Sequence, residues 1–295
     1  MLFTLNPNAG KGAKNNEMFN AIDSFIKSGY DVETYITQSA GDLTNVLKAK
    51  ADKYDTIVVW GGDGTLNEGV NGLMLAPKSV VSLGYIPRGT VNDFASSLCI
   101  SKKSELACEN ICKGTPKFVD LGKFGERYFT YVAAFGAFTR VSYATSQRKK
   151  KLLARLAYLI EGVKSVPTIK PTHAKVTVGG EVFENDYVYG MISNSKSVGG
   201  FKIPDMVVDM NDGEFEVLLV TMPKNLGQWF ELITTLLSKK MSSPLIKIIK
   251  TNEAKFEFSK ETPWTVDGEF GGNTLEITVS AVKSAIKIIC PGNNN

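Results

Sequence analysis

The segment from Gly61 to Glu68 combines glycines with acidic and amide side chains, directly after the apolar run Thr56–Trp60. Its three glycines in four positions let the backbone approach phosphate oxygens closely. Amides at the start of a following helix would attract the same negative charge. Asp63 would repel a phosphate unless a cation lies between them, and Mg²⁺ bridges carboxylate and phosphate oxygens. The segment therefore predicts a Mg²⁺-assisted phosphate site capped by Asn67 and Glu68, with a tight turn alone as the alternative.

A second loop, from Asn6 to Gly12, follows the apolar run Leu2–Leu5. It lacks the spacing of a Walker phosphate loop, so we do not interpret it as one. Its glycines, Gly10 and Gly12, permit close backbone approach to an anion. A plain strand-to-helix turn explains this loop equally well.

The third loop, from Pro87 to Asp93, follows a strand-like run that ends at Ile86. Thr90 or Asn92 is suited to capping a helix, and the Gly89-Thr90 pair beside these polar residues is also suited to binding phosphate or ribose. In an open parallel sheet, ligands bind outside the carboxyl ends of the strands. Because all three loops follow strands in this way, together they predict a nucleotide site at one edge of a sheet.

Two carboxylates near the C-terminus, Asp267 and Glu269, flank Gly268. In an extended strand, residues two apart point to the same face, so both side chains would reach one pocket. A positioned carboxylate can accept the proton of an alcohol during phosphoryl transfer, which contributes about 10²–10⁴-fold to the rate. The residues by themselves leave open whether this segment holds a base or forms a surface acidic turn.

Alternating strand-like and helix-like segments position the three loops. Strands are expected at residues 2–5, 32–37, 56–60 and 80–86, and helices around 18–26, at 41–53, after 92 and at 102–113. Such alternation predicts an α/β fold with a mostly parallel sheet and helices on both faces. We place this first domain at residues 1–121.

Strand-like runs separated by turns dominate the rest of the chain. They are expected at residues 117–123, 128–135, 187–193, 215–222, 254–259, 274–279 and 285–290, with a further hairpin formed by 173–178, the turn Gly179-Gly180 and the segment through Asp186, and with helices at about 146–165 and 226–239. This pattern predicts an antiparallel β-sandwich or barrel over residues 122–295. The extreme C-terminus is free to return to the first domain.

The composition excludes several classes of protein. A formal net charge of +4 is too small to mark a nucleic-acid binder. No apolar run reaches the roughly 18–20 residues that a spanning helix needs, and no signal peptide is visible, so we expect a cytoplasmic protein. His173 is the single histidine and the four cysteines lack metal spacing, which argues against a zinc site or a Ser-His-Asp relay.

The motifs taken together resemble the diacylglycerol kinase catalytic family, in particular its soluble bacterial branch. The matching segments keep the family's order: Asn6 to Gly10, Gly61-Gly62-Asp63-Gly64-Thr65, Pro87 to Asp93, and Asp267-Gly268-Glu269. A Gly-Gly-Asp-Gly-Thr loop also occurs in NAD kinases and phosphofructokinases, but the later segments favour a lipid kinase. The resemblance implies a Rossmann-like domain of the NAD kinase type, then an antiparallel β-sandwich domain, with ATP bound between them.

The resemblance also implies roles for individual residues. Glu269 would be the general base, with Asp267 helping to hold Mg²⁺ and with Asp93 and Asp120 linking the base to the metal. A structural Mg²⁺ would lie at Asp209, Asp212 and Glu214, partly on backbone carbonyls, although Asn211-Asp212-Gly213 is just as good a hairpin turn. The positions implied for ATP are Asn6, Pro7, Asn8, Ala9, Gly10, Thr37, Gly61, Gly62, Asp63, Gly64, Thr65, Leu66, Asn67, Glu68 and Thr90.

The implied reaction transfers the γ-phosphate of ATP to a lipid hydroxyl, first of all that of diacylglycerol, within phospholipid metabolism. The basic cluster Gln147–Lys151 and the apolar residues after it suit peripheral contact with an anionic membrane, or equally a helix packed on the second domain. Val198–Phe201 would line a lipid entrance. A sphingoid base as acceptor, an NAD kinase and a non-enzymatic sensor remain alternatives, and a homodimer stays open.

Overall fold

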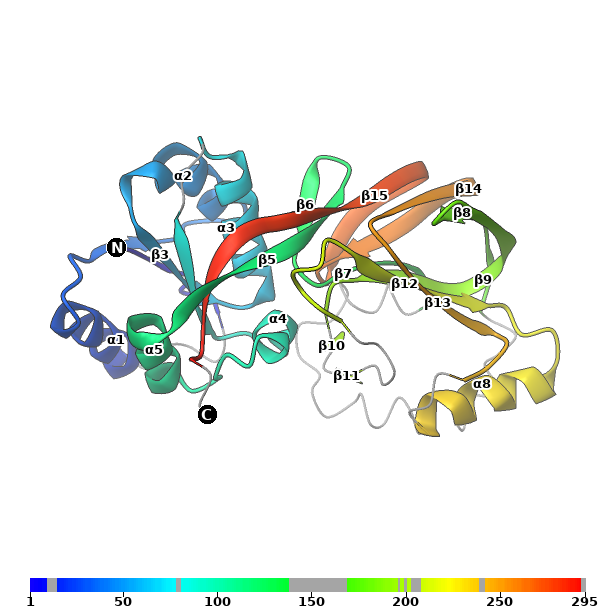
Figure 1. Ribbon diagram of the computed structural model, residues 1–295, viewed down its shortest axis with the longest axis horizontal. Coiled ribbons are helices and arrows are strands. Elements are labelled where there is room, and N and C mark those ends of the chain that lie inside the picture. Colours follow the sequence, from blue (N-terminus) through cyan, green and yellow to red (C-terminus); the bar gives the residue numbers. More distant parts are fainter. Residues whose placement is uncertain are drawn as a thin grey trace. The chain divides into compact units, whose positions relative to one another are not determined.

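The chain forms two compact units in a computed structural model (Figure 1). Unit 1 comprises Met1–Leu121, Met210–Gly213 and Val282–Asn295, and unit 2 comprises Gly122–Asp209 and Glu214–Ala281. The structure describes residues 1–9, 15–77, 81–137, 169–195, 197–198, 201–202, 208–238 and 242–292.

A parallel sheet forms the centre of unit 1. Its strands are β1 (Leu2–Leu5), β2 (Glu33–Ile36), β3 (Thr56–Gly61), β4 (Ser82–Pro87) and the last part of β15 (Glu269–Cys290). They pair in the order β2-β1-β3-β4-β15, and every pair is parallel. Because the strands are parallel, the loops after β1, β3 and β4 emerge at the same edge.

Helices cover both faces of this sheet (Figure 1). They are α1 (Asn15–Lys27), α2 (Asp42–Lys50), the 3₁₀ turn η1 (Ala51–Lys53), α3 (Asp63–Leu75), α4 (Asp93–Ser97) and α5 (Ser104–Lys113). Successive residues of β3 point to opposite faces, as a strand requires. Val58 packs in one core with Phe25 of α1 and Ile111 of α5, whereas Val59 lies against α3 at Gly69.

Unit 2 is built from antiparallel strands. They are β5 (Thr115–Phe124), which begins in unit 1, β6 (Arg127–Phe129), β7 (Val132–Gly136), β8 (Thr172–Val178), β9 (Glu181–Ser193), β12 (Phe215–Thr221), β13 (Ile246–Thr251), β14 (Glu253–Val266) and the first part of β15. A separate short pair consists of β10 (Ser197–Val198) and β11 (Phe201–Lys202), and the described part of this unit also contains the helix α8 (Leu226–Ser238). Strands β7 and β8 each pair with both β9 and β14, so these four strands close on themselves.

Large aromatic side chains fill the interior of unit 2. Trp264 is fully buried, and its ring lies 5.0 Å from the rings of Phe124 and Phe135 and 5.3 Å from that of Phe256. Such ring pairs add to the stabilisation that burial alone provides. The core explains why the strands of this half carry alternating apolar residues.

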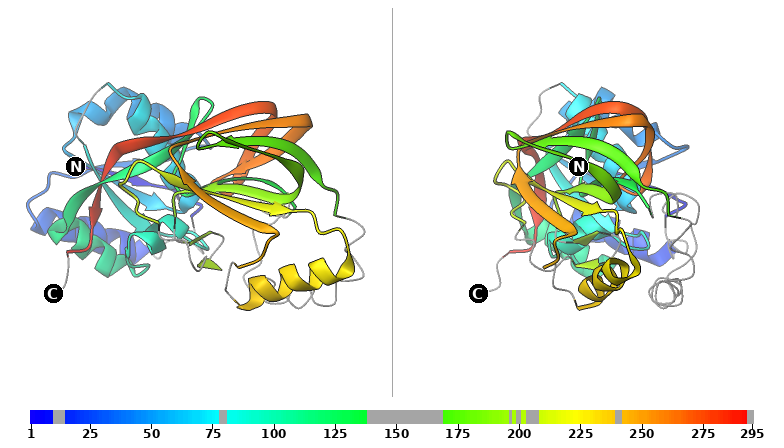
Figure 2. Two further views of the ribbon diagram at one scale, coloured as in Figure 1. Left: turned by 45° about the vertical axis from the view of Figure 1, so that its right-hand side comes forward. Right: turned by 90° about the vertical axis from the view of Figure 1, so that its right-hand side faces the viewer.

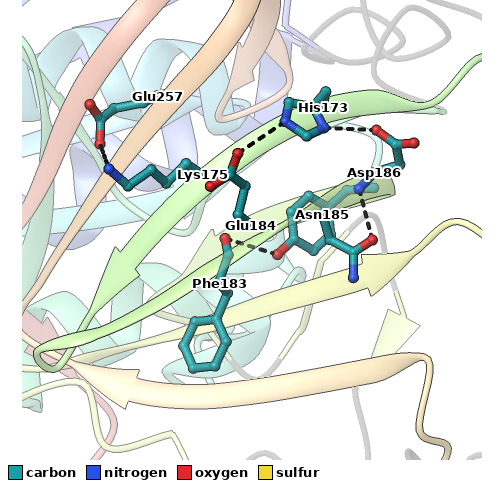
Figure 3. A network of polar contacts seen from close by, with 8 residues as sticks. His173, Lys175, Phe183, Glu184, Asn185, Asp186 and Glu257 are labelled. Carbon is teal, nitrogen blue, oxygen red and sulfur yellow. Dashed lines mark hydrogen bonds and ion pairs between the residues drawn. The ribbon is translucent and has the colours of Figure 1, made fainter.

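The outer surface of the β8–β9 hairpin carries a polar network (Figure 3). His173 Nδ1 lies 3.0 Å from Asp186 Oδ1, and His173 Nε2 lies 3.5 Å from Glu184 Oε1. The contact with Asp186 is the main cause that raises the pKa of His173 above its usual 6.5. The histidine is therefore an exposed cross-strand partner, and no group of three metal-ligating side chains forms in the described part of the chain.

The predicted fold class is confirmed: an α/β unit is followed by an antiparallel β unit. Several boundaries differ from prediction. The expected strand at 128–135 divides into β6 and β7, the strands expected at 274–279 and 285–290 are parts of the single strand β15, and β13 was not predicted. The helix expected at 146–165 and the basic cluster 147–151 lie outside the described residues.

Two segments of the predicted second domain, residues 122–295, belong to unit 1 in the structure: Met210–Gly213 and Val282–Asn295. For Val282–Asn295 the cause is strand pairing, because Lys287 and Ile288 align with Ser82 and Leu83 of β4. Met210 and Gly213 are instead hydrogen-bonded to Asp120. Within the described ranges, no helix is long and apolar enough to cross a membrane.

Candidate nucleotide and acceptor sites

The loops after β3 and β4 touch through two glycines. A Cβ atom built on Gly89 would lie 2.8 Å from the Cα of Gly62, and one built on Gly62 would lie 3.1 Å from the Cα of Gly89. The amide of Arg88 also donates to the carbonyl of Gly61 at 2.7 Å. Side chains at these positions would force the loops apart, which explains why both loops carry glycine here.

Asp63 and Asn92 join the same two loops. The backbone amide of Asn92 donates to Asp63 Oδ2 at 2.8 Å. Asn92 adopts a left-handed φ of 56°, and its side chain bonds both the amide (2.8 Å) and the carbonyl (2.9 Å) of Gly89. Asp63 therefore has a structural reason to lie among glycines, which the sequence did not reveal.

The buried phenol of Tyr85 lies next to Asn92, at the contact between the two loops. Its oxygen is 3.4 Å from Asn92 Oδ1. Burial raises the pKa of Tyr85 well above its ordinary value, and the charge of Asp63 adds to that rise. The phenol consequently stays protonated and can donate to the Asn92 amide oxygen.

The loop after β1 connects to the start of α3. Asn6 Nδ2 donates to Thr65 Oγ1 at 2.8 Å, and Asn6 Oδ1 accepts the amide of Asn8 at 2.9 Å. A Cβ on Gly61 would lie 2.4 Å from Thr65 Cβ, so Thr65 fills the space that glycine leaves. Three loops are thus joined into one framework at the strand ends.

Other positions expected to contact the nucleotide surround this framework. Thr37 follows β2, is buried and donates its amide to the carbonyl of Leu5 at 2.9 Å. Pro7, Asn8 and Thr90 are exposed, whereas Ala9 is buried. Gly10 lies outside the described residues.

Helix α3 begins at Asp63, directly after Gly62. No side chain caps it at Gly62, and the first-turn amides of a helix have no acceptor within the helix. Such a helix start favours an anion. Asn67 and Glu68, which were expected to cap the loop, lie in the second turn of α3, where Asn67 accepts a bond from Asn71 and the carbonyl of Glu68 accepts one from Thr44.

Asp120 holds three segments of unit 1 together. Its carboxylate accepts the amides of Gly213 and Ser284, both at 2.6 Å, and its own amide donates to the carbonyl of Met210 at 2.7 Å. Ser284 is held with a left-handed φ of 50° and donates its hydroxyl to Asn211 Oδ1 at 2.9 Å. Asp93, the other residue expected in the acidic network, is buried at the start of α4.

The loop implied as a structural Mg²⁺ site contains the segment that Asp120 holds. Glu214 Oε2 lies 3.4 Å from Lys250 Nζ. Among the described residues, no three acidic, histidine or cysteine side chains gather closely enough to hold a metal ion, so Asp209, Asp212 and Glu214 form no side-chain cluster.

Asp267 and Gly268 are the two central residues of a hairpin turn between β14 and β15. Val266 pairs with Glu269, and Asp267 and Gly268 have φ values of 46° and 84°. Two positive φ values are the mark of a type I′ turn. The expectation that Asp267 and Glu269 share one strand face was wrong, because a turn and not an extended strand separates them.

The Asp267 carboxylate is surrounded by donors. Oδ2 accepts the amide and the hydroxyl of Thr130 at 2.6 and 2.8 Å, and Oδ1 accepts the amides of Tyr131 and Val132 at 3.0 and 3.1 Å. Asp267 is only 3% exposed; burial raises its pKa, and the four bonds oppose that rise. This side chain fixes the turn, and using it to hold a metal would break bonds that the fold requires.

Glu269 differs from its neighbour in the turn. It is the first residue of β15 and is exposed to solvent. The anchoring of Asp267 fixes the backbone from which the Glu269 side chain projects. Of the two carboxylates, Glu269 is therefore the one that is exposed to solvent.

Comparison with known proteins identifies the family. The model of the diacylglycerol kinase catalytic domain matches residues 1–124, and that of the YegS C-terminal NAD kinase beta sandwich-like domain matches residues 132–290. The diacylglycerol kinase of Bacillus subtilis is 33% identical over 273 residues, covering 90% of this chain and 88% of its own. That of Staphylococcus carnosus is 32% identical over 290 residues, covering 97% and 93%. The chain belongs to the diacylglycerol kinase family.

Solved structures agree with this assignment to the diacylglycerol kinase family. A diacylglycerol kinase from Bacillus anthracis superposes with a TM-score of 0.78 at 25% identity, covering 98% of this chain and 96% of its own. An NAD kinase from Archaeoglobus fulgidus in complex with ATP superposes with a TM-score of 0.57 at 11% identity, covering 98% and 93%, which shows a shared fold only. The resemblance inferred from the motifs is confirmed, and members of the family are lipid kinases, phosphotransferases that act on an alcohol.

Sequence reasoning missed three residues that shape these family motifs. Asn92 was considered only as a helix cap or ligand, and Thr130 and Ser284 were not considered. The Asp267-Gly268 dipeptide is a known hairpin signal and could have revealed the turn. Nothing near Thr130 or Ser284 in the sequence indicates that each meets a buried aspartate more than 130 positions away.

Proposed function

We propose that this chain transfers the γ-phosphate of ATP to the hydroxyl of diacylglycerol and yields phosphatidate. The proposal depends chiefly on one observation, the direct contact of Gly62 and Gly89 beside the start of α3. This contact, closed by the bond from Asn92 to Asp63, holds two of the three loops together beside a helix start that favours an anion. Family membership supports a lipid acceptor.

The residues at the strand ends suit a nucleotide. The glycines allow close backbone approach, the start of α3 favours negative charge, and Asn6 and Thr65 hold the first loop against the second. Bound Mg²⁺ would neutralise phosphate charge during transfer, with Asp63 as an acidic side chain at the junction of two of these loops. Asp63 would then have two roles, joining the loops and attracting the cation.

Glu269 is proposed as the general base that accepts the proton of the acceptor hydroxyl. It is exposed, it is carried by a rigid turn, and carboxylates serve this role in phosphoryl transfer. Asp267 is proposed as a positioning residue, since its carboxylate is engaged by four donors. Asp93 and Asp120 would likewise shape the site through the segments they hold.

An acceptor panel tests the proposal. Purified protein would be incubated with labelled ATP, Mg²⁺ and, separately, diacylglycerol, a sphingoid base or NAD. We expect label in phosphatidate and in neither of the other products. Label in phosphorylated NAD would replace the proposal with a nucleotide kinase, and label in the sphingoid base would keep the lipid kinase but change its acceptor.

Two substitutions at Asp63 separate its roles. Asp63→Asn keeps an oxygen that can accept the Asn92 amide but removes the negative charge, whereas Asp63→Ala removes both. We expect both variants to lose most activity, and only Asp63→Ala to lose stability. Full activity in Asp63→Asn would show that charge at this position is unnecessary and would remove the metal role.

A further inference from the structure

Arg88, in the loop after β4, has a charged side chain that is enclosed by three neighbours. Its Cζ lies 5.2 Å from the centre of the Trp60 ring. Its Nη1 lies 2.7 Å from Glu17 Oε2 and donates to Ser104 Oγ at 2.9 Å. The side chain of Arg88 is only 18% exposed. Because the planar guanidinium is held by a carboxylate, a hydroxyl and an aromatic face, it is an anchor for the loop that carries it.

The three polar side chains of this contact all bond to one another. The hydroxyl of Ser104 donates to Glu17 Oε2 at 3.3 Å while it accepts from Arg88. Glu17 lies in the first turn of α1, and Ser104, which is buried, is the first residue of α5. We call Arg88, Glu17 and Ser104 the Arg88 cluster. It joins the loop after β4 to the starts of two helices.

Helices α1 and α5 lie side by side on one face of the unit 1 sheet (Figures 1 and 2). Phe25 of α1 and Ile111 of α5 share one hydrophobic core with Trp60 of β3. This packing holds the bodies of both helices against the sheet, and the Arg88 cluster adds a polar contact at their starts. Since α1 is the first helix after the loop that contains Asn6, the cluster connects the loop after β4 with the helix that follows the loop after β1.

The segment before α5 supports the loop after β4 at a second point. Lys102, two residues before Ser104, donates its ammonium to the carbonyl of Val91 at 2.5 Å. On the other side, the amide of Arg88 donates to the carbonyl of Gly61 at 2.7 Å. The loop is thus held from two sides, by the start of α5 and by the loop after β3, and it has little freedom to move relative to either.

A second ion pair of α1 makes a useful contrast. Lys27 Nζ lies 2.7 Å from Asp23 Oδ2, the same distance as in the pair of Arg88 with Glu17. Its two side chains are 74% and 58% exposed, and both belong to α1. Such an exposed pair contributes little to stability, and this one connects two residues of a single helix. Asp23 is therefore a control for Glu17, with the same kind of contact in the same helix.

We propose that Arg88 is a positioning residue for the nucleotide, which holds the loop Pro87–Asp93 in its binding arrangement through Glu17 and Ser104. The guanidinium already has a carboxylate partner, so its proposed role is to fix the loop and not to bind phosphate itself. A loop that takes its binding arrangement in only a fraction of the molecules binds with an affinity lowered by that fraction. The proposal rests on the proposed function, because it takes ATP as the ligand of this loop.

Titration calorimetry with a non-hydrolysable ATP analogue and Mg²⁺ tests this role. The full chain would be compared with Arg88→Met, which keeps an apolar stem against Trp60 but removes the guanidinium, after urea unfolding has shown that the variant is folded. We expect Arg88→Met to bind the analogue about tenfold more weakly, as for a loop that is in place about a tenth of the time. Glu17→Gln should lose less, since its amide oxygen still accepts a bond from Arg88, and Asp23→Asn should bind like the unaltered protein.

Two further variants distinguish positioning from a general effect on stability. Arg88→Lys keeps the charge but lacks the planar guanidinium that contacts Trp60 and both polar partners, so its affinity should lie between those of the unaltered protein and Arg88→Met. The double variant Arg88→Met/Glu17→Gln should bind no more weakly than Arg88→Met, because both changes remove one contact. Losses that multiply would show that Arg88 and Glu17 act independently and would overturn the role of the cluster.

Kinase assays on diacylglycerol keep this proposal apart from the proposed function. Arg88→Met should raise the KM for ATP, with kcat at saturating ATP and the KM for diacylglycerol close to those of the unaltered protein. An unchanged affinity for the analogue in Arg88→Met, an equal loss in Asp23→Asn or a loss confined to kcat would overturn the role of Arg88. If the unaltered protein binds the analogue but phosphorylates no lipid, the proposed function fails, and calorimetry still decides the role of Arg88. If it does not bind the analogue, both proposals fail.

Discussion

Two aspartates beside glycines, Asp63 in unit 1 and Asp267 in unit 2, have similar local sequences and different surroundings. Asp63 is partly buried, starts a helix and accepts the amide of Asn92 from a neighbouring loop. Asp267 is buried, lies in a two-residue turn and accepts four bonds from Thr130, Tyr131 and Val132. The two aspartates therefore differ in their expected roles. Asp63 lies at the loops that we propose bind the nucleotide, whereas Asp267 fixes the turn that carries Glu269.

The sharpest test of this comparison uses Glu269, the residue that Asp267 positions. Glu269→Gln should lower kcat by about 10²–10⁴-fold, because the amide cannot accept the proton of the acceptor hydroxyl. Its stability should stay close to that of the unaltered protein, since the side chain is exposed. Steady-state kinetics on monomeric diacylglycerol and urea denaturation measure the two quantities. A kcat within a few-fold of normal would remove Glu269 as the base.

Asp267→Ala should lose stability as well as activity, whereas Glu269→Gln should lose activity alone. Removing the carboxylate leaves the buried donors of Thr130, Tyr131 and Val132 without an acceptor, which we expect to cost about 3 kcal/mol or more. Urea unfolding, with Glu269→Gln as the matched control from the same turn, measures this cost. Equal stability of the two variants would mean that the donors around Asp267 find water.

Asp267 and Glu269 also show how much of the fold and of the site could be predicted from the sequence. Strand-helix alternation and the three loops of unit 1 were predictable, because periodicity and glycine spacing are local properties. The turn at Asp267-Gly268 was also predictable from its dipeptide, although the strand rule was applied across it. The donors that surround Asp267 were not predictable, because Thr130 to Val132 lie more than 130 positions away in the sequence. The 22-residue strand β15 was also missed, since Ser280, Lys283 and Ser284 between its two apolar parts suggested a break that the structure does not have.

A substitution in the unit 1 framework should have a smaller effect. A methyl group at Gly89 would lie 2.6 Å from Asn92 Oδ1 and 2.8 Å from the Cα of Gly62, so Gly89→Ala must move one loop. We expect a stability loss of about 1–3 kcal/mol and a raised KM for ATP. Gly292→Ala is the matched control, because nothing lies within 4 Å of that position. An unchanged KM in Gly89→Ala would indicate that the contact of the two loops does not shape the nucleotide site.

The smallest effect is expected at the surface of unit 2, where an exposed polar network contrasts with the buried bonds of Asp267. The neighbouring Asp186 raises the folded-state pKa of His173 above 6.5, so the protonated imidazole stabilises the β8–β9 hairpin. This stabilisation is complete below the unfolded pKa and is lost as pH rises through the folded pKa. His173→Gln should therefore unfold at a slightly lower temperature than the unaltered protein at about pH 6, and at the same temperature at about pH 9. Thermal unfolding at both pH values tests this, and a difference that persists in alkali would assign the effect to packing and not to charge.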